Sequence, residues 1–402
     1  MRKIVVFLLL LSIMSSLSAR KNNIQWRGED RTGIYNETNL SKSWAEDGPE
    51  MLWFFDGLGE GHSSVAIADD KLYVTGLSEG QGYLYVFDLN GKLLNKKGYS
   101  KEWDTNYNGS RGTVTINEGK VYIISGHGDI VCMNEKNLDI VWTKNMLSDF
   151  ESKNITWGIN EAPLIVGEKL IATPGGAKNN IVALNKNTGK LIWSSEGEGD
   201  LSAYCSPLYV GDQKTPQVVT MTANHIVGVD IATGKKLWSF ENKNRHAVHA
   251  NTPVYGDNML LCTSGYGKGS TMLRLVDGGR NVEKVWETAE LDSRIGGIVK
   301  LGDYAYGSGD ANKFWFCFDW KTGEQKYKER AFQPGVVISA NGMLYCYSER
   351  GEIALVKAAP EKFEVTSKFS VTKGTDQHWA HPVIYQGVLY VRHGDSLIAY
   401  RI

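Results

Sequence analysis

Short apolar segments alternate with clusters of turn residues along almost the whole chain after residue 50. The clearest unit is Ala183–Trp193, which reads ALNKNTGKLIW, and its pattern returns 45 residues later in Gly228–Trp238, which reads GVDIATGKKLW. In both copies an apolar strand ends at Asn or Asp, whose side chain can accept hydrogen bonds from amides two residues on. The Gly supplies the positive φ that a bulged hairpin needs. The pattern predicts a β-hairpin whose second strand ends in Trp.

The unit recurs in weaker form along the chain, and a second hairpin precedes each copy. One position of that preceding hairpin recurs eight times, at residues 73, 122, 171, 219, 260, 306, 345 and 390. The steps of 39 to 49 residues are the period of propellers with four strands in each blade. Helical repeats are excluded because the apolar residues alternate with period two. The sequence therefore predicts an all-β fold, an eight-bladed β-propeller of four-stranded antiparallel blades.

The last repeat is one strand short. After its second strand only Leu397–Ile402 remain, which is enough for a single further strand. Met51–Phe55 lies just before the first repeat and has the apolar residues and the Trp of an outer strand. We expect this N-terminal strand to complete the eighth blade and close the ring, because closure removes exposed sheet edges. The propeller is predicted to span residues 51–402.

The first residues predict export. A charged start, an apolar run over Ile4–Met14 and the small residues Ser16–Ala19 are typical of a signal peptide, here residues 1–19. The apolar run is too short for a transmembrane helix, and no membrane span is predicted elsewhere. We expect a periplasmic or secreted, monomeric protein.

Residues 20–50 are polar and do not fit the repeat. Their isolated aromatics are Trp26, Tyr35 and Trp44. We interpret this segment as an irregular N-terminal arm laid across the ring and held there by the aromatic side chains. A partly disordered leader is the alternative.

The repeat resembles that of the pyrroloquinoline-quinone (PQQ)-like β-propellers, through the shared pattern Ala/Gly-x-Asp/Asn-x-x-Thr-Gly-Lys-x-x-Trp. Gln25–Gly28 and the following Arg31–Tyr35 are similar to the start of exported bacterial proteins with this propeller. The resemblance covers nearly the whole mature chain and implies that Trp and Gly pack between neighbouring blades. It leaves function open, because the family includes quinoprotein alcohol dehydrogenases and the outer-membrane assembly scaffold BamB.

Net charge and cysteine content narrow the range of functions that the sequence allows. The formal net charge of −1 argues against a nucleic-acid partner. The five cysteines are Cys132, Cys205, Cys262, Cys317 and Cys346. Their number is odd and most lie in apolar strands, so we expect buried apolar residues rather than disulfides. No two are adjacent, unlike the Cys pair typical of the quinoprotein dehydrogenases. No Cys follows the apolar leader, unlike the lipid-anchored scaffold.

The candidate functional residues lie in the links between the outer strand of one blade and the inner strand of the next. These links converge on one face of a propeller, around its central channel. Here they carry five of the eight His together with Trp, Tyr and Arg. The predicted ligand-binding residues, called the funnel residues below, are His62, Arg111, Trp157, Asn160, Glu161, Tyr204, His246, His249, Arg294, His378, Trp379 and His381. A plain water-filled channel lining is the alternative.

Metal and cofactor chemistry have weaker support in the links. The two His-x-x-His spacings, at residues 246–249 and 378–381, are not held on one face as a helical pair would be, so no metal site is predicted. The resemblance implies PQQ with Ca²⁺ as the cofactor, and Asp292 is the one Asp in the links that suits a catalytic base. No residue can be matched to the cofactor motif of the family, so no catalytic residue is assigned and the cofactor stays open.

A Gly-rich stretch at Gly265–Ser270 is interpreted as a hairpin loop, since no helix follows it to form a phosphate site. Together these features predict an exported, non-catalytic propeller that binds a protein or a small ligand through the funnel. The alternative is an enzyme similar to PQQ-dependent alcohol dehydrogenases. A sugar- or polymer-binding module is a third hypothesis, motivated by the aromatic residues.

Overall fold

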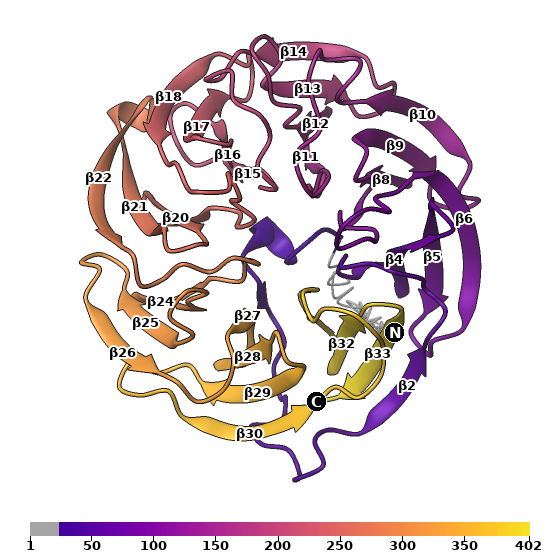
Figure 1. The fold of residues 1–402 in the computed structure, drawn as a ribbon, viewed down its shortest axis with the longest axis vertical. Helices are drawn as coiled ribbons and strands as arrows, with labels where there is room; N and C mark the ends of the chain where they lie inside the picture. Colours follow the sequence, from indigo (N-terminus) through magenta and orange to yellow (C-terminus); the bar gives the residue numbers. More distant parts are fainter. Residues whose placement is uncertain (1–23) are drawn as a thin grey trace, which may run out of the picture.

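Strands surround a central channel in a ring of eight sheets (Figure 1). The computed structural model describes residues 24–402, so the predicted signal peptide lies outside the described residues. Each sheet holds four antiparallel strands, and one sheet gains a fifth strand from the arm. The all-β, eight-bladed propeller predicted from the repeat is confirmed.

The strands of each blade follow one another from the channel outward. Blade 1 contains β3 (Ala66–Ala68), β4 (Lys71–Ser78), β5 (Gln81–Asp88) and β6 (Leu93–Lys101). Blade 2 contains β7 (Thr115–Asn117), β8 (Lys120–Ile124), β9 (Asp129–Asn134) and β10 (Ile140–Asn145). Blade 3 contains β11 (Leu164–Val166), β12 (Lys169–Ala172), β13 (Ile181–Asn185) and β14 (Leu191–Ser195). Blade 4 contains β15 (Leu208–Val210), β16 (Gln217–Met221), β17 (His225–Asp230) and β18 (Lys236–Glu241).

The second half of the ring repeats this order. Blade 5 contains β19 (Val254–Gly256), β20 (Met259–Ser264), β21 (Gly269–Val276) and β22 (Asn281–Thr288). Blade 6 contains β23 (Val299–Leu301), β24 (Tyr304–Ser308), β25 (Trp315–Asp319) and β26 (Gln325–Glu329). Blade 7 contains β27 (Gly335–Ala340), β28 (Met343–Ser348), β29 (Glu352–Lys357) and β30 (Val365–Ser370). Blade 8 contains β31 (Val383–Tyr385), β32 (Val388–His393), β33 (Ser396–Arg401) and the outer strand β2 (Met51–Phe55).

The ring closes through β2, as predicted. This strand runs antiparallel to β33, with Trp53 opposite Ala399 and Phe55 opposite Leu397. Figure 1 shows β2 beside the C-terminal β33, so the two ends of the propeller share one blade. The closure leaves no blade with an unpaired third strand.

Four joints between neighbouring blades are closed by one type of contact. Trp193 of blade 3 covers Gly234 of blade 4, where an added Cβ would lie 2.5 Å from the indole. The indole Nε1 also donates to the Ile231 carbonyl at 3.0 Å. We call this contact a Trp–Gly joint. The same contact with Gly, completed by a hydrogen bond from the indole to a nearby carbonyl, is made by Trp53 with Gly91, Trp142 with Gly189 and Trp286 with Gly323.

Trp238 departs from this rule although its sequence unit is nearly the same. Its indole lies over Gly228 of its own blade and donates to the Gln217 side chain at 2.7 Å. Gln217 in turn donates to the Gly279 carbonyl of blade 5 at 2.8 Å. The joint between blades 4 and 5 is therefore made through Gln217 rather than by the Trp itself.

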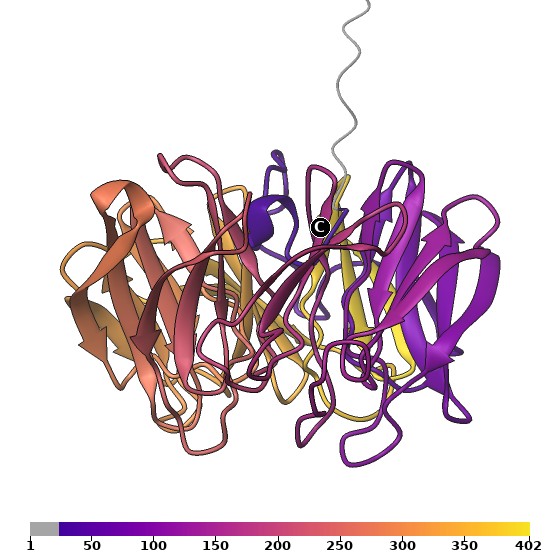
Figure 2. The same ribbon diagram turned by 90° about the horizontal axis from the view of Figure 1, so that it is seen from above.

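The arm enters the channel instead of lying flat across the ring (Figure 2). It forms a short 3-10 turn, η1 (Glu29–Arg31), and β1 (Ile34–Tyr35), which pairs in parallel with β27. Arg31 donates to the Pro163 and Pro207 carbonyls of blades 3 and 4. Arg27 contacts blades 6, 7 and 8. The two buried arginines of the arm, Arg27 and Arg31, therefore contact both sides of the ring.

The sequence reading of the cysteines is confirmed, because all five are free and buried. The Gly-rich stretch is the hairpin loop between β20 and β21, also as predicted. Within residues 24–402, no helix has the length and apolar character needed to span a membrane.

Candidate functional site

A cavity of about 190 Å³ lies where the interblade links meet the arm. Every link contributes to its wall except the one between blades 6 and 7. The wall is formed by Trp26, His62, Tyr107, Arg111, Thr113, Trp157, Asn160, Ala162, Tyr204, Ser206, Val248, Ala250, Tyr266, Arg294, Ile295, Trp379 and His381. We call this space the funnel cavity.

Most of the predicted funnel residues meet at this cavity. Those that line it are His62, Arg111, Trp157, Asn160, Tyr204, Arg294, Trp379 and His381. His246 lies at the margin, where its ring makes edge contacts with Tyr266 at 4.6 Å and with Trp157 at 6.4 Å between centroids. The links therefore converge in space as the propeller geometry requires.

Glu161, His249 and His378 do not line the cavity. Within the links alternate residues face the cavity: Asn160 and Ala162 line it, and so do Val248 and Ala250. Side chains in extended segments alternate between two sides, so the residue between two lining positions points away. The prediction from sequence that Glu161, His249 and His378 line the cavity did not take this alternation into account.

Two of the residues that point away have structural partners. His249 is buried, and its nitrogens contact Ser264 Oγ at 2.6 Å and the Ala223 carbonyl at 3.2 Å. His378 stacks on His393 with centroids 3.6 Å apart. The two His-x-x-His pairs therefore place their members in different environments. No group of three or more His, Cys, Asp and Glu within residues 24–402 could hold a metal ion.

Two groups of aromatic side chains form the walls of the funnel cavity. In the first, Trp379 contacts His62 at 5.0 Å and Tyr107 at 5.4 Å between ring centroids. In the second, Trp157 contacts Tyr204 at 6.1 Å, and His246 connects it to Tyr266. These rings supply flat apolar surfaces in a site that also contains polar groups, the usual composition of a small-molecule pocket.

Arg111 and His62 carry the unsatisfied polar atoms of the cavity wall. Arg111 is nine-tenths buried and donates to the Tyr107 carbonyl, but its Nε has no hydrogen-bond partner. Both ring nitrogens of His62 are buried and also lack partners. Burial lowers the pKa of His62 to about 3, with Arg111 adding to the effect, so the imidazole is neutral at neutral pH. Unpaired buried polar atoms are uncommon and call for an explanation.

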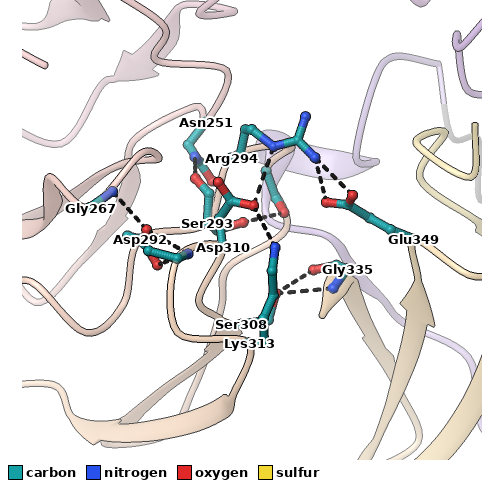
Figure 3. Close-up of polar contacts among 12 residues, drawn as sticks. Asn251, Gly267, Asp292, Ser293, Arg294, Ser308, Asp310, Lys313, Gly335 and Glu349 are labelled. Carbon is teal, nitrogen blue, oxygen red and sulfur yellow. Dashed lines mark hydrogen bonds and ion pairs between the residues drawn. The ribbon is translucent and has the colours of Figure 1, made fainter. Parts of the chain in front are cut away.

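Arg294, the second arginine of the wall, is already paired (Figure 3). Its Nη2 donates to both carboxylate oxygens of Glu349, at 2.8 and 2.9 Å, and its Nε contacts Asp310 at 3.4 Å. Lys313 contacts the same Asp310 oxygen at 3.1 Å. The guanidinium also lies over Trp379, 5.5 Å from the ring centroid. Its charge is therefore largely balanced within the protein.

His381 belongs to the anchoring of the arm. Arg27 Nη1 lies 3.0 Å from His381 Nδ1, which must accept because a guanidinium only donates. His381 Nε2 then carries the proton and donates to the Ile295 carbonyl at 3.1 Å. Burial lowers the pKa of His381 to about 3, which keeps this neutral tautomer. Both nitrogens are thus used before any ligand arrives.

The sequence reading missed Trp26, Tyr107 and Tyr266 as lining residues. Tyr107 lies shortly before Arg111 in the same link, and Trp26 lies in the Gln25–Gly28 motif, so both had a local signal in the sequence. Tyr266 lies at the tip of the β20–β21 loop, which was read as a hairpin only. Its position in the cavity depends on how far that loop reaches across the face.

A family model described as outer membrane protein assembly factor BamB (PQQ_2) matches residues 80–329. The chain belongs to this family. This membership confirms the family resemblance of the repeat. The matched residues include most of those that form the cavity wall. It does not name a ligand or an activity for the chain.

The chain is similar to curated relatives and solved structures of two kinds. Quinoprotein ethanol dehydrogenases of Pseudomonas putida and Pseudomonas aeruginosa are 24% and 25% identical over 119 residues, or 29% of this chain. The matched region spans 19% of their own length. BamB from Moraxella catarrhalis is similar in structure with a TM-score of 0.67 and 14% identity, covering 88% of this chain and 100% of that one. Quinohemoprotein alcohol dehydrogenase from Comamonas testosteroni gives 0.68 and 12%, covering 94% of this chain and 80% of that one.

The residues at the cavity do not fit a PQQ–Ca²⁺ centre. PQQ carries three carboxylates, whereas Arg294 is already paired with acidic side chains. Asp292, the candidate base, does not line the cavity; it is buried and accepts from the Gly267 and Ala311 amides at 2.8 and 3.0 Å (Figure 3). Glu161, a funnel residue of a type that can hold Ca²⁺, also lies outside the wall, and burial raises its pKa to about 8.

Proposed function

We propose that this protein is an exported, non-catalytic propeller that binds a small ligand in the funnel cavity. The observation that carries the proposal is the cavity itself, where the links supply aromatic walls and leave Arg111 and His62 with unpaired polar atoms. Concave, mostly aromatic sites with a few polar groups are the common form of ligand pockets.

The arm supports a closed pocket rather than an open channel. Trp26 forms part of the cavity wall, and Arg27 and Arg31 next to it tie the arm to the ring on both sides. A ligand entering from the link face would therefore meet the arm instead of passing through the ring. Export rests on the charged and apolar pattern of residues 1–19.

A quinoprotein-type oxidoreductase is the second candidate function. The structural likeness to quinohemoprotein alcohol dehydrogenase and the short match to quinoprotein ethanol dehydrogenases favour it. The side chains at the cavity favour the binding module, because Asp292 and Glu161 are buried away from the cavity. A protein partner, as for an assembly scaffold, would use the same face through a peptide.

The test is a ligand screen of the mature protein by thermal shift, using neutral sugars, acidic sugars, aromatic acids, and PQQ with and without Ca²⁺. We expect at least one class to stabilise the wild type and to lose its effect in Trp379→Ala. If no class produces a shift that depends on Trp379, the proposed function is wrong. Dye-linked alcohol oxidation in the presence of PQQ and Ca²⁺ would replace it with the enzyme.

A further inference from the structure

The two arginines at the funnel cavity differ in whether an acidic side chain balances their charge, and this difference favours some ligands over others. No Asp or Glu lines the cavity, and its two cationic residues are Arg111 and Arg294. Arg294 is neutralised by Glu349 and Asp310. Arg111 makes no ion pair with any residue in the described part of the chain, 24–402. The cavity therefore offers one uncompensated guanidinium, which suits one carboxylate.

The acidic groups near Arg111 do not remove this charge. Glu102 is fully buried and is held by the Tyr99 hydroxyl and by the Trp103 and Gly126 amides. Both of its oxygens are used by these donors, and Glu102 forms no ion pair with Arg111. Asp376 is exposed to solvent, where screening weakens its attraction. An incoming carboxylate would still find Arg111 unpaired.

His62 adds a second requirement beside Arg111. A neutral imidazole has one donor nitrogen and one acceptor nitrogen, and neither has a partner here. These nitrogens are covered by protein in the unliganded site, so a ligand hydroxyl, which both donates and accepts, would reach one of them only after the ring turns toward the cavity. Ser206, Thr113 and Asn160 bring further hydroxyl and amide groups to the same wall. The polar groups thus suit a ligand with several hydroxyls next to its carboxylate.

The aromatic walls fix the shape of the ligand. Trp379 lies in the link before blade 8 and Trp157 in the link before blade 3, and both line the cavity. A ring can lie against such faces through its apolar C–H surface, while its hydroxyls reach the polar wall. We propose that the funnel cavity binds an acidic sugar, a pyranose ring with a single carboxylate held by Arg111. This proposal rests on the proposed function, since it names the ligand class of the same cavity.

The experiment titrates the mature protein with D-glucuronate and D-galacturonate by calorimetry, beside D-glucose, D-glucuronamide and 4-hydroxybenzoate. D-glucuronamide keeps the ring and its hydroxyls and removes the charge. We expect at least one uronate to bind at least about 10-fold more tightly than its neutral counterparts, because a site built around one polar contact rejects analogues that lack it. We also expect 4-hydroxybenzoate to bind more weakly than that uronate, because it lacks the sugar hydroxyls.

Variants test whether Arg111 is the residue that holds the carboxylate. Arg111→Gln should reduce uronate affinity at least about 10-fold, and the exposed Arg245→Gln, on the link between blades 4 and 5, should leave it unchanged. If Arg111→Gln does not fold, the comparison of glucuronate with glucuronamide in the wild type still decides. Equal affinity for the two, or tighter binding of 4-hydroxybenzoate, would overturn the acidic-sugar proposal while leaving a binding module in place. A complete absence of Trp379-dependent binding by every class overturns the proposed function instead.

Discussion

The outer wall of the ring and its inner face are built from the same repeat but differ in what their aromatic and polar side chains contact. In the wall, Trp193 covers a Gly of the next blade and its indole nitrogen has a carbonyl partner. On the inner face, Arg111 and His62 keep buried nitrogens without partners. The Trp–Gly joints of the wall are satisfied within the protein, although the Tyr327 hydroxyl of the wall lacks a partner, whereas the unpaired nitrogens of the face belong to residues that line a cavity. This difference supports our proposal that the link residues provide the binding chemistry, while the joints of the repeat provide stability.

The largest expected effect is on ring closure. Deletion of Met51–Phe55 removes the outer strand of blade 8 and the Trp–Gly joint of Trp53, and it exposes the edge of β33. We expect no cooperative unfolding transition by circular dichroism. The matched control is Phe54→Ser, because that side chain is 43% exposed and should be replaceable at little cost. A deletion variant that melts like the wild type would refute the closure.

The next effect compares two buried indoles of the wall. Trp193→Ala and Trp238→Ala should each lower the free energy of unfolding by about 3–5 kcal/mol, since each removes a large packed side chain. Chemical denaturation measures both. Ile192→Ala beside Trp193 is the control, because its side chain is 44% exposed and should change stability by less than about 0.5 kcal/mol. Equal losses in Trp193→Ala and Ile192→Ala would show that the indole does not hold the joint.

A smaller effect concerns pH and the inner face. Burial raises the pKa of Glu161 from 4.5 to about 8, and one of its oxygens has no partner. The folded state then keeps a proton that the unfolded state releases, so stability falls as pH rises from about 4.5 to 8. Glu161→Gln should weaken this decline, by at most about 1.4 kcal/mol per pH unit, and should be more stable than the wild type at pH 8.

Unfolding by urea at pH 5, 6.5 and 8 measures the Glu161 effect. The exposed Glu46→Gln serves as the control and should keep the wild-type pH dependence. Parallel pH profiles for the wild type and Glu161→Gln would mean that the buried carboxyl does not hold its proton in the folded protein.

The ring could be predicted from sequence because its signals are local. The Thr-Gly turns, the period-two strands and the terminal Trp each report on a few neighbouring residues, and their spacing gives the blade count. The closing strand at Met51–Phe55 could be predicted because the last repeat lacked an outer strand. Trp238 shows the limit of this reasoning: its sequence unit matches that of Trp193, but Gln217 of β16, two strands away in the same blade, gives its indole a different partner.

The cavity could be predicted only in part. Link positions placed Arg111, Trp157 and Trp379 on one face, because every propeller brings its links together. Which residue of each link faces inward depends on the alternation of the extended chain, and this separated Asn160 from Glu161. The contributions of Trp26 and Tyr266 depend on where the arm and a long hairpin loop come to rest. No local pattern encodes such long-range packing.

The central claim, that the wall carries stability and the inner face carries binding, is tested most directly by one paired measurement. Trp193→Ala and Trp379→Ala are compared for unfolding free energy and for affinity toward D-glucuronate. The account predicts that Trp193→Ala loses about 3–5 kcal/mol of stability and keeps the wild-type affinity. Trp379→Ala, half-buried at the cavity, should lose less stability and at least about 10-fold in affinity. Wild-type affinity in Trp379→Ala, or equal losses of both properties in both variants, would contradict the claim.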